Sequence, residues 1–464
     1  MTVRHEAMNN EKSMKRTAVI IAVANGVIFT FLGSAINILL PAMGKEFGMN
    51  TVQMGWVVTA FLLTSTAFLL PFGRLSDIIG HKRMFLIGVT IYSIVTFLLA
   101  VLPCNATALI AFRALQGLTA SMLFVTGVTL LISIYPPAER GKILGINAAC
   151  VYLGLSLGPP LGGALTYYFS WRSPFIITAV VNFILAIYVL LKLKGEWAEA
   201  KGESFDIKGS LIYILSFSAM FTGFSIIPKT SGFILMPIGL IGLIIFIIYE
   251  NKRPFPILKT AIFKKNKAFT IAAVSALINF SATFVVAFLI SLYLQNMKGF
   301  TSLHAGKIML VQPVLQTIFS LFSGRLADKK DPQSIASVGM AITVLGLIML
   351  IFVQKDTSLP YIITALGVIA IGFGVFSSPN TTAAMNAVEK QYFGVASSLL
   401  WTMRLIGQIT SMSIAVIVFT LITKEATVTV DNSDLFLHSM RVILIISAIL
   451  CFISVFLKTR KKTE

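Results

Sequence analysis

The chain has 464 residues, of which 56% are hydrophobic and only 12% are charged, and its formal net charge is +19 at pH 7. Soluble proteins carry about 25% charged residues, so the composition excludes a soluble globular protein and indicates a polytopic membrane protein. Lys and Arg are scattered between apolar runs and form no single patch, so we expect no nucleic-acid partner.

Apolar runs follow one another along the whole chain. Each is about 17 to 25 residues long, enough to cross ~30 Å of hydrocarbon as a helix. We expect roughly fourteen spans, and therefore an all-α polytopic membrane protein. The spans begin near Thr17, Val52, Met84, Ala106, Ile143, Pro174, Ile207, Phe233, Ala268, Ala305, Ile335, Leu359, Val395 and Leu435.

Basic residues gather in alternate loops, and an excess of Lys and Arg marks the cytoplasmic side of a membrane protein. The loops expected inside carry Arg140, Lys142, Lys192, Lys194, Lys252, Arg253, Lys329 and Lys330. With an even number of spans, both termini are expected in the cytoplasm of a multi-pass protein of the cell membrane.

The three cysteines have no metal-ligand spacing, so we expect neither a disulfide framework nor a metal site.

A short polar hinge, Gly73 to Arg83, separates the second and third spans and is expected to be a cytoplasmic loop. Its glycines allow a tight turn, and its carboxylate can accept hydrogen bonds at a helix end, as a breakable gate requires. The alternative is a merely solvated basic loop. The expected gate residues in this hinge and in a weaker second copy are Gly73, Arg74, Asp77, Gly80, Lys82, Arg83, Gly324, Arg325 and Asp328.

The second copy, Gly324 to Asp328, lies 251 residues after the first and indicates an internal repeat. We predict two six-helix halves, residues 1–195 and 261–464, separated by two extra central spans in residues 196–260. Paired halves with a site at their midplane interface are typical of secondary transporters.

The fourth span places Arg113 and Gln116 inside an apolar helix. A buried guanidinium there costs at least ~2.5 kcal/mol unless it faces water, a partner or a substrate. Arg113 is therefore a candidate functional residue. The alternative is an arginine that snorkels to the interface or binds backbone carbonyls.

The fifth span carries glycines at every fourth position, Gly154, Gly158 and Gly162, with Pro159 and Gly163 beside them. This spacing makes one flat stripe on which another helix can pack closely, and proline kinks the helix.

These motifs resemble those of the major facilitator superfamily. The hinge is similar to its signature, Arg113 to its fourth-span arginine, and the glycine stripe to the antiporter motif of its exporters. Trp171-Arg172 and Tyr293-Leu294-Gln295 also resemble the fourteen-span drug:proton antiporter family. The resemblance implies a major facilitator fold, export coupled to proton entry with a role for Arg113, and a cytoplasmic latch of the hinge charges that stabilises the outward-open state.

The sequence departs from that family in its first span, where Leu32 stands in place of a carboxylate, and no proposed span has a mid-span Asp or Glu. Buried carboxylates are the usual carriers that exchange a proton for a cation. The polar residues expected in the cavity are instead positive or neutral, so we expect a neutral or anionic amphipathic substrate. They are Arg113, Gln116, Asn37, Arg404, Gln312 and Gln316.

We therefore predict a secondary active transporter, a proton-coupled exporter of amphipathic drug-like compounds. A transporter of lipids or of neutral or anionic metabolites with little proton coupling is the first alternative, and a transport-inactive sensor or scaffold is the second. No nucleophile, base and orienting residue are grouped as in an enzyme. The expected partners are a small amphipathic substrate and the lipid bilayer, with no cofactor, the proton gradient as energy source, and a monomer as the functional unit.

Overall fold

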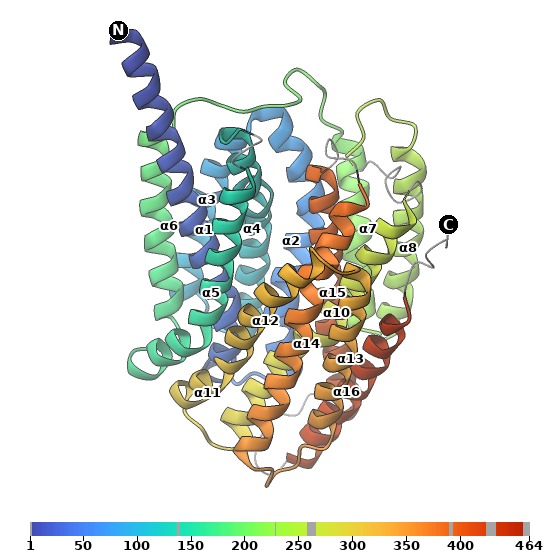
Figure 1. The fold of residues 1–464 in the computed structure, drawn as a ribbon. Coiled ribbons are helices and arrows are strands. Elements are labelled where there is room, and N and C mark those ends of the chain that lie inside the picture. The colour runs from blue at the N-terminus through green and yellow to red at the C-terminus, as the bar shows by residue number, and fades with distance from the viewer. Residues whose placement is uncertain are drawn as a thin grey trace.

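The computed structural model describes residues 2–136, 140–227, 229–257, 266–388, 393–423 and 433–457, and in these ranges helices are the only regular elements (Figure 1). Fourteen of the described helical segments are long and apolar enough to cross a membrane. The predicted fold class and span number are confirmed.

The first six spans pack together into an N-terminal half. Asn50 starts α2 with a reciprocal cap, because its Oδ1 accepts from the Gln53 amide at 2.8 Å while Gln53 Oε1 accepts from the Asn50 amide at 3.1 Å. Such caps satisfy the free amides of a first turn. The helices are α1 (Thr2–Phe47), α2 (Thr51–Ile79), α3 (His81–Val101), α4 (Ala106–Ile134), α5 (Arg140–Tyr168) and α6 (Ser173–Lys192).

Two further helices, α7 (Ile207–Ser225) and α8 (Thr230–Glu250), form a hairpin. They cross closely, since a Cβ on Gly239 would lie 2.2 Å from the Met220 amide nitrogen. Helix α7 contacts both α2 and α15. The hairpin therefore touches helices from both ends of the chain, and the Ser225 and Ser413 hydroxyls lie 2.7 Å apart.

The last six spans form a C-terminal half. Its first span continues from α10 into a π-helical turn, η1, and its second is made of α11 and α12. The elements are α10 (Lys267–Leu292), η1 (Tyr293–Met297), α11 (Ser302–Met309), α12 (Val311–Ala327), α13 (Pro332–Ile351), α14 (Leu359–Asn386), α15 (Phe393–Thr423) and α16 (Ser433–Val455).

The internal repeat is visible in backbone packing. A Cβ on Gly154 of α5 would lie 2.3 Å from the Val27 carbonyl of α1, and one on Gly407 of α15 would lie 2.4 Å from the Leu277 carbonyl of α10. Glycine thus permits the same close approach in each half. The predicted boundary after residue 195 falls in the connector between α6 and α7, whereas the one after residue 260 lies outside the described residues, and both stay predictions.

One expectation about element ends is wrong. The first candidate span begins at Met14, close to the expected start near Thr17, although helix α1 itself begins at Thr2. The hinge is not a loop, because α2 runs to Ile79 and α3 begins at His81, with Gly80 alone between them. Gly80 has φ +107°, which a residue with a side chain adopts only with strain. One glycine is therefore enough to reverse the chain.

Candidate transport site

The two halves close against each other at one face of the molecule. We call the face where α2 ends and α3 begins the terminal face, and the other the opposite face. At the opposite face the Ser302 hydroxyl of α11 donates to the Gly163 carbonyl of α5 at 3.0 Å. A Cβ on Gly306 would lie 2.3 Å from the Pro159 carbonyl. Glycines on both helices thus allow backbone-to-backbone closure between the halves.

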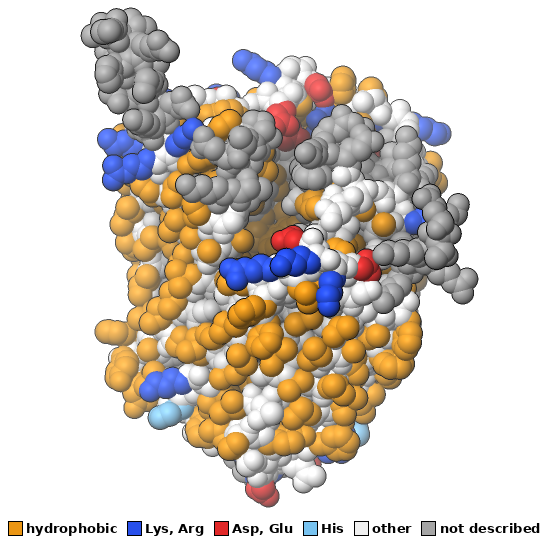
Figure 2. Space-filling view, in the orientation of Figure 1, with side chains coloured by type: hydrophobic (Ala, Val, Ile, Leu, Met, Phe, Trp, Pro, Cys, Tyr) orange, Lys and Arg blue, Asp and Glu red, His pale blue; other side chains and the backbone are white. Residues whose placement is uncertain are grey.

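Toward the terminal face, Figure 2 shows a hollow in the upper part of the molecule, with hydrophobic side chains on its visible walls. Deeper in the protein, the Phe124 ring of α4 meets the Trp401 ring of α15, with centroids 5.9 Å apart. Phe124 lies roughly 15 Å below the terminal end of α4 at 1.5 Å per residue. This aromatic pair is thus a contact between the halves well inside the protein.

Arg404 lies one helical turn beyond Trp401 on α15. Its guanidinium donates to the Thr381 hydroxyl at 2.6 Å and lies 5.8 Å from the ring centroids of Phe280 and of Trp401. Its buried Nε has no hydrogen-bond partner among the described residues, and no ion pair with a described carboxylate is formed there. We call Phe124, Phe280, Thr381, Trp401 and Arg404 the arginine–aromatic site. It combines an unsatisfied cationic donor with flat apolar surfaces.

Arg113 lies elsewhere, inside the N-terminal half. Only 3% of its surface is exposed, its Nε donates to the Val57 carbonyl at 3.0 Å, and its guanidinium also donates to Gln116. The Phe61 ring centroid lies 4.4 Å from its Cζ. Gln116 in turn donates to Thr96 at 2.9 Å. Arg113 and Arg404 therefore do not form one site in this conformation. Arg113 binds a backbone carbonyl and an amide within α2 and α4, which is the alternative that the sequence offered for it.

Of the four predicted cavity amides, three lie where the two halves meet and one, Gln116, lies inside the N-terminal half. Gln312 and Gln316 are half-buried on α12, two turns and one turn before Ser320, respectively. Since Ser320 hydrogen-bonds Tyr152 of α5 at 3.1 Å, this face of α12 looks toward the N-terminal half. Asn37 is 5% exposed and lies where α1 meets α10. These three residues thus line the junction of the halves, whereas Gln116 does not.

The glycine stripe of α5 faces α1. A Cβ on Gly158 would lie 2.1 Å from the Ser34 hydroxyl, and one on Gly162 would lie 2.7 Å from the Ala35 Cβ. Gly163 and Pro159 point the other way, to α11 of the other half. One face of α5 thus packs against α1 of its own half, and the other face packs against α11 of the other half.

The hinge is covered by the connector between α6 and α7. Both Glu196 carboxylate oxygens accept hydrogen bonds from the first turn of α3, from the Lys82 amide at 2.8 Å and the Arg83 amide at 3.1 Å. Glu203 forms an ion pair with Arg74. The backbone carbonyl of Asp77 accepts from Ala200 at 3.0 Å. In this conformation the hinge is held by its own half and the adjoining connector.

The second copy of the hinge is more exposed to solvent. Arg325 and Asp328 are exposed at the end of α12, and Asp331 caps α13 by accepting from the Ser334 amide at 3.1 Å. Gly324 has a packing role, since a Cβ there would lie 2.7 Å from the Ser378 hydroxyl of α14. Gly73, by contrast, would meet nothing closer than 3.7 Å. In the first hinge, therefore, Gly80 must be glycine for steric reasons, whereas Gly73 has room for a side chain.

Replacing Glu196 by alanine is expected to loosen the first turn of α3. A side-chain cap contributes about 1 kcal/mol, which corresponds to about fivefold faster amide hydrogen exchange if the turn opens locally. Exchange of the Lys82 and Arg83 amides, followed by mass spectrometry, measures it. Glu199→Ala is the matched control, because Glu199 caps no helix among the described residues. Equal exchange in the two variants would contradict the capping role.

The pair Trp171-Arg172 anchors the opposite face of the N-terminal half. The Arg172 guanidinium forms an ion pair with Glu46 at the end of α1, at 2.5 Å, and the Trp171 indole donates to the same carboxylate at 2.7 Å. The hydrogen bond to Glu46 raises the pKa of Arg172 above its ordinary value. These contacts tie the end of α1 to the start of α6.

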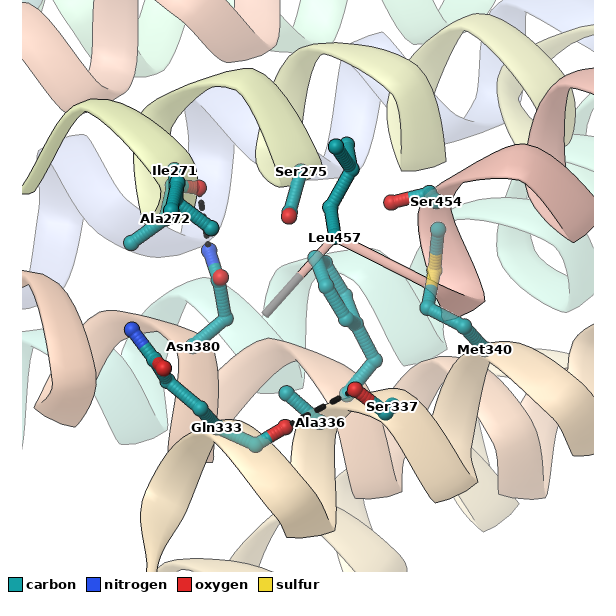
Figure 3. Close-up of a pocket in the computed structure, with 11 residues that line it drawn as sticks. Ile271, Ala272, Ser275, Gln333, Ala336, Ser337, Met340, Asn380, Ser454 and Leu457 are labelled. Atoms are coloured by element: carbon teal, nitrogen blue, oxygen red, sulfur yellow. Dashed lines mark hydrogen bonds between the residues drawn. The ribbon is translucent and has the colours of Figure 1, made fainter. Parts of the chain in front are cut away.

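A small pocket lies within the C-terminal half, and none of its lining residues belongs to the arginine–aromatic site. Figure 3 shows it among α10, α13, α14 and α16, with Asn380 donating to the Ala272 carbonyl at 3.1 Å. Its interior has room for about one water molecule, whereas most small-molecule sites are far larger. It is too small for a drug-sized substrate as it stands.

Sequence reasoning missed most of the arginine–aromatic site and the acidic residues of the connector. Trp401 could have been found, because it precedes Arg404 by three residues and such pairs share a helix face. Phe124, Phe280 and Thr381 come from three other helices, and no spacing in the sequence joins them. Glu196 and Glu203 belong to no motif in the sequence, so nothing pointed to their contacts with the hinge.

Comparison with known proteins is consistent with this arrangement. The family model described as Major Facilitator Superfamily matches residues 22–412. The riboflavin transporter RibZ of Clostridioides difficile (strain 630) is 31% identical over 391 residues, covering 83% of this chain and 84% of the relative. The multidrug resistance protein Stp of Mycobacterium tuberculosis (strain H37Rv) is 27% identical over 403 residues, covering 85% of this chain and 74% of that protein.

Solved structures agree in fold. A bacterial homologue of the human lysosomal transporter Spinster, in an inward-facing and unoccupied conformation, superposes with a TM-score of 0.68 at 13% identity, covering 97% of this chain and 96% of the other. A structure from a study of proton-dependent oligopeptide transporters gives a TM-score of 0.65 at 15% identity, covering 96% and 98%. The family match, the paired halves and the fourteen spans lead to one conclusion: this chain is a multi-pass membrane transporter of the major facilitator superfamily.

Proposed function

We propose that the protein is a secondary active exporter of neutral or anionic amphipathic compounds, driven by proton entry across the cell membrane, with both termini in the cytoplasm. The observation that carries the proposal is the arginine–aromatic site. A half-buried guanidinium whose Nε–H has no partner among the described residues attracts an anion or a polar acceptor, and aromatic rings bind flat apolar surfaces. We also propose that a monomer is the working unit and that no cofactor takes part.

The charge preference rests on what surrounds Arg404. Acidic residues in the candidate spans are Glu46, Asp77, Glu250 and Asp434, and all lie in a first or last turn. A cationic substrate would therefore meet a fixed positive charge with no carboxylate beside it, which is unfavourable in a low-dielectric site. Export is favoured by the α5 stripe, which resembles that of exporters, and by relatives named as multidrug resistance proteins.

A second candidate substrate class is a neutral heteroaromatic compound such as riboflavin. The relative RibZ is named as a riboflavin transporter. The half-buried Phe280 and Trp401 offer stacking surfaces for a planar ring system, and Gln312 and Gln316 offer neutral hydrogen-bonding groups. A neutral substrate also avoids repulsion by Arg404. This candidate differs from the main proposal in its substrate, a neutral metabolite, and in needing little or no coupling to protons.

The test is flux and proton movement in proteoliposomes that enclose a pH-sensitive dye, with protein-free liposomes as the control. The substrates are one cationic amphiphile, one anionic amphiphile and riboflavin. Proton movement driven by the anionic or neutral compounds supports the proposal. Proton movement driven only by the cation contradicts the charge argument, and flux without proton movement contradicts the coupling. Binding without flux of any compound would favour the scaffold alternative.

A further inference from the structure

The structure contains a polar contact between the halves that neither the substrate nor the hinge accounts for. Pro41 lies inside α1. Proline has no amide hydrogen, so the carbonyl four residues earlier, that of Asn37, loses its helical donor. A carbonyl in a membrane interior needs another donor.

That donor comes from the other half. The Ser291 hydroxyl of α10 donates to the Asn37 carbonyl. One turn further on, the Gln295 side-chain amide donates to the Ile38 carbonyl at 3.1 Å and to the Ser291 hydroxyl at 3.0 Å. Ser291 is fully buried, and Gln295 lies in the π-helical turn η1. Two segments that are more than 250 residues apart in the chain thus meet at one point.

The same chemistry occurs inside the N-terminal half, where it bridges two helices of one half. Pro159 of α5 frees the Leu155 carbonyl, and the Ser34 hydroxyl of α1 donates to it at 2.8 Å. Helices α1 and α5 belong to one half, so this bond can persist through a transport cycle. The bond from α10 to α1 joins the halves and must break when the opposite face opens.

We propose that Ser291 and Gln295 form a reversible latch on the proline-freed segment of α1 and set how often the opposite face is closed. Water entering an open gate can satisfy the Asn37 and Ile38 carbonyls, so breaking the latch leaves no buried acceptor unpaired. The closed state has one opposing feature, since the buried Asn37 Oδ1 has no hydrogen-bond partner among the described residues. The desolvation of this oxygen destabilises the closed state. The hydrogen bonds of Ser291 and Gln295 stabilise the closed state and oppose that effect.

The proposal requires only that the halves rock and is independent of the substrate and of proton coupling, so its failure and that of the proposed function are distinguishable. It is tested by electron–electron distance measurements between spin labels at Lys45→Cys and Lys355→Cys, in lipid nanodiscs without substrate. Both lysines are exposed near the opposite face, one in each half. The three native cysteines are replaced by serine.

A hydrogen bond of this kind changes the closed-to-open ratio by about three- to fivefold. Ser291→Ala and Gln295→Leu should each lower the ratio by that factor, and the double variant by about tenfold or more. Asn37→Leu, which removes the unsatisfied oxygen, should raise it. Ser281→Ala is the matched control, because the Ser281 hydroxyl donates only to Leu277 of its own helix, at 2.8 Å.

A double variant whose distance distribution equals that of Ser281→Ala overturns the proposal, as does an Asn37→Leu variant that shifts toward the open state. If Ser291→Ala is not recovered as folded protein, Ser291→Thr and Gln295→Leu provide the comparison. Threonine keeps the hydroxyl and should retain the closed population, whereas leucine at position 295 should lower it.

Discussion

Valine in place of Gly154 is expected to separate α1 from α5 and to lower the melting temperature of the protein strongly. A Cβ at this position would lie 2.1 Å from the Thr30 hydroxyl and 2.3 Å from the Val27 carbonyl. The carbonyl belongs to the backbone, so the helices must move apart. That movement also breaks the bonds from Thr30 to the Val151 carbonyl, at 3.0 Å, and from Ser34 to Leu155.

Overpacking of this kind costs about 1 to 3 kcal/mol or more, and the two lost hydrogen bonds add about 1 kcal/mol each. The melting temperature in detergent, read from the monodisperse peak of a fluorescent fusion after heating, measures the effect. Gly145→Val is the matched control on the same helix, since a Cβ on Gly145 would meet no atom within 4 Å. Valine there should be neutral or slightly stabilising. Equal melting temperatures for the two variants would show that the stripe tolerates side chains.

Arg404→Met is expected to weaken transport of anionic substrates at least tenfold while leaving transport of neutral ones within about threefold. Hydrogen bonds to charged groups contribute about 1.5 to 3 kcal/mol, and methionine keeps much of the apolar stem. The fold should survive, because Arg404 forms no ion pair with a described carboxylate and its removal leaves no buried counter-charge. Initial rates of uptake into proteoliposomes, as a function of substrate concentration, give the change in kcat/KM for each substrate.

Arg113→Met is the comparison that makes this result specific. Arg113 lies within the packing of α2 and α4 and donates to Val57 and Gln116. Its loss should therefore lower transport of neutral and anionic substrates by similar factors. If Arg113→Met removed the preference for anions and Arg404→Met did not, the assignment of charge recognition to the C-terminal half would be wrong.

The sequence predicted the large-scale order of the molecule because that order depends on local properties. Span number follows from the length of apolar runs, and the stripe of α5 follows from the spacing of its glycines. That Arg113 binds a backbone carbonyl was one of the alternatives drawn from the sequence. Which carbonyl it binds could not be predicted, since the direction in which a helix face points depends on how neighbouring helices are rotated. The charges of the hinge suggested an exposed loop, but charged side chains in a last helical turn reach water without ending the helix.

The residues that surround Arg404 in the arginine–aromatic site could not be predicted for the same reason. Phe280, Thr381 and Arg404 are brought together by contacts of α10, α14 and α15, and these contacts depend on glycine positions such as Gly407. The Pro41 effect on Asn37 was available from the sequence, since the acceptor lies four residues before any helical proline. Its donor on α10 was not, because only the fold pairs these two helices.

The close glycine contacts of α5 with α1, and of Gly117 with the Phe61 carbonyl of α2, join residues that all precede the α6–α7 connector. The latch on Asn37 needs α10, which the ribosome makes more than a hundred residues after the α5 stripe. Since chains begin to fold from the N-terminus as they are synthesised, the first six helices can assemble in the membrane before their partners exist. During that interval the Asn37 carbonyl lacks its Ser291 donor and needs water or another hydrogen-bond donor, so a chain truncated before α10 would present a polar notch on the surface of its first six helices.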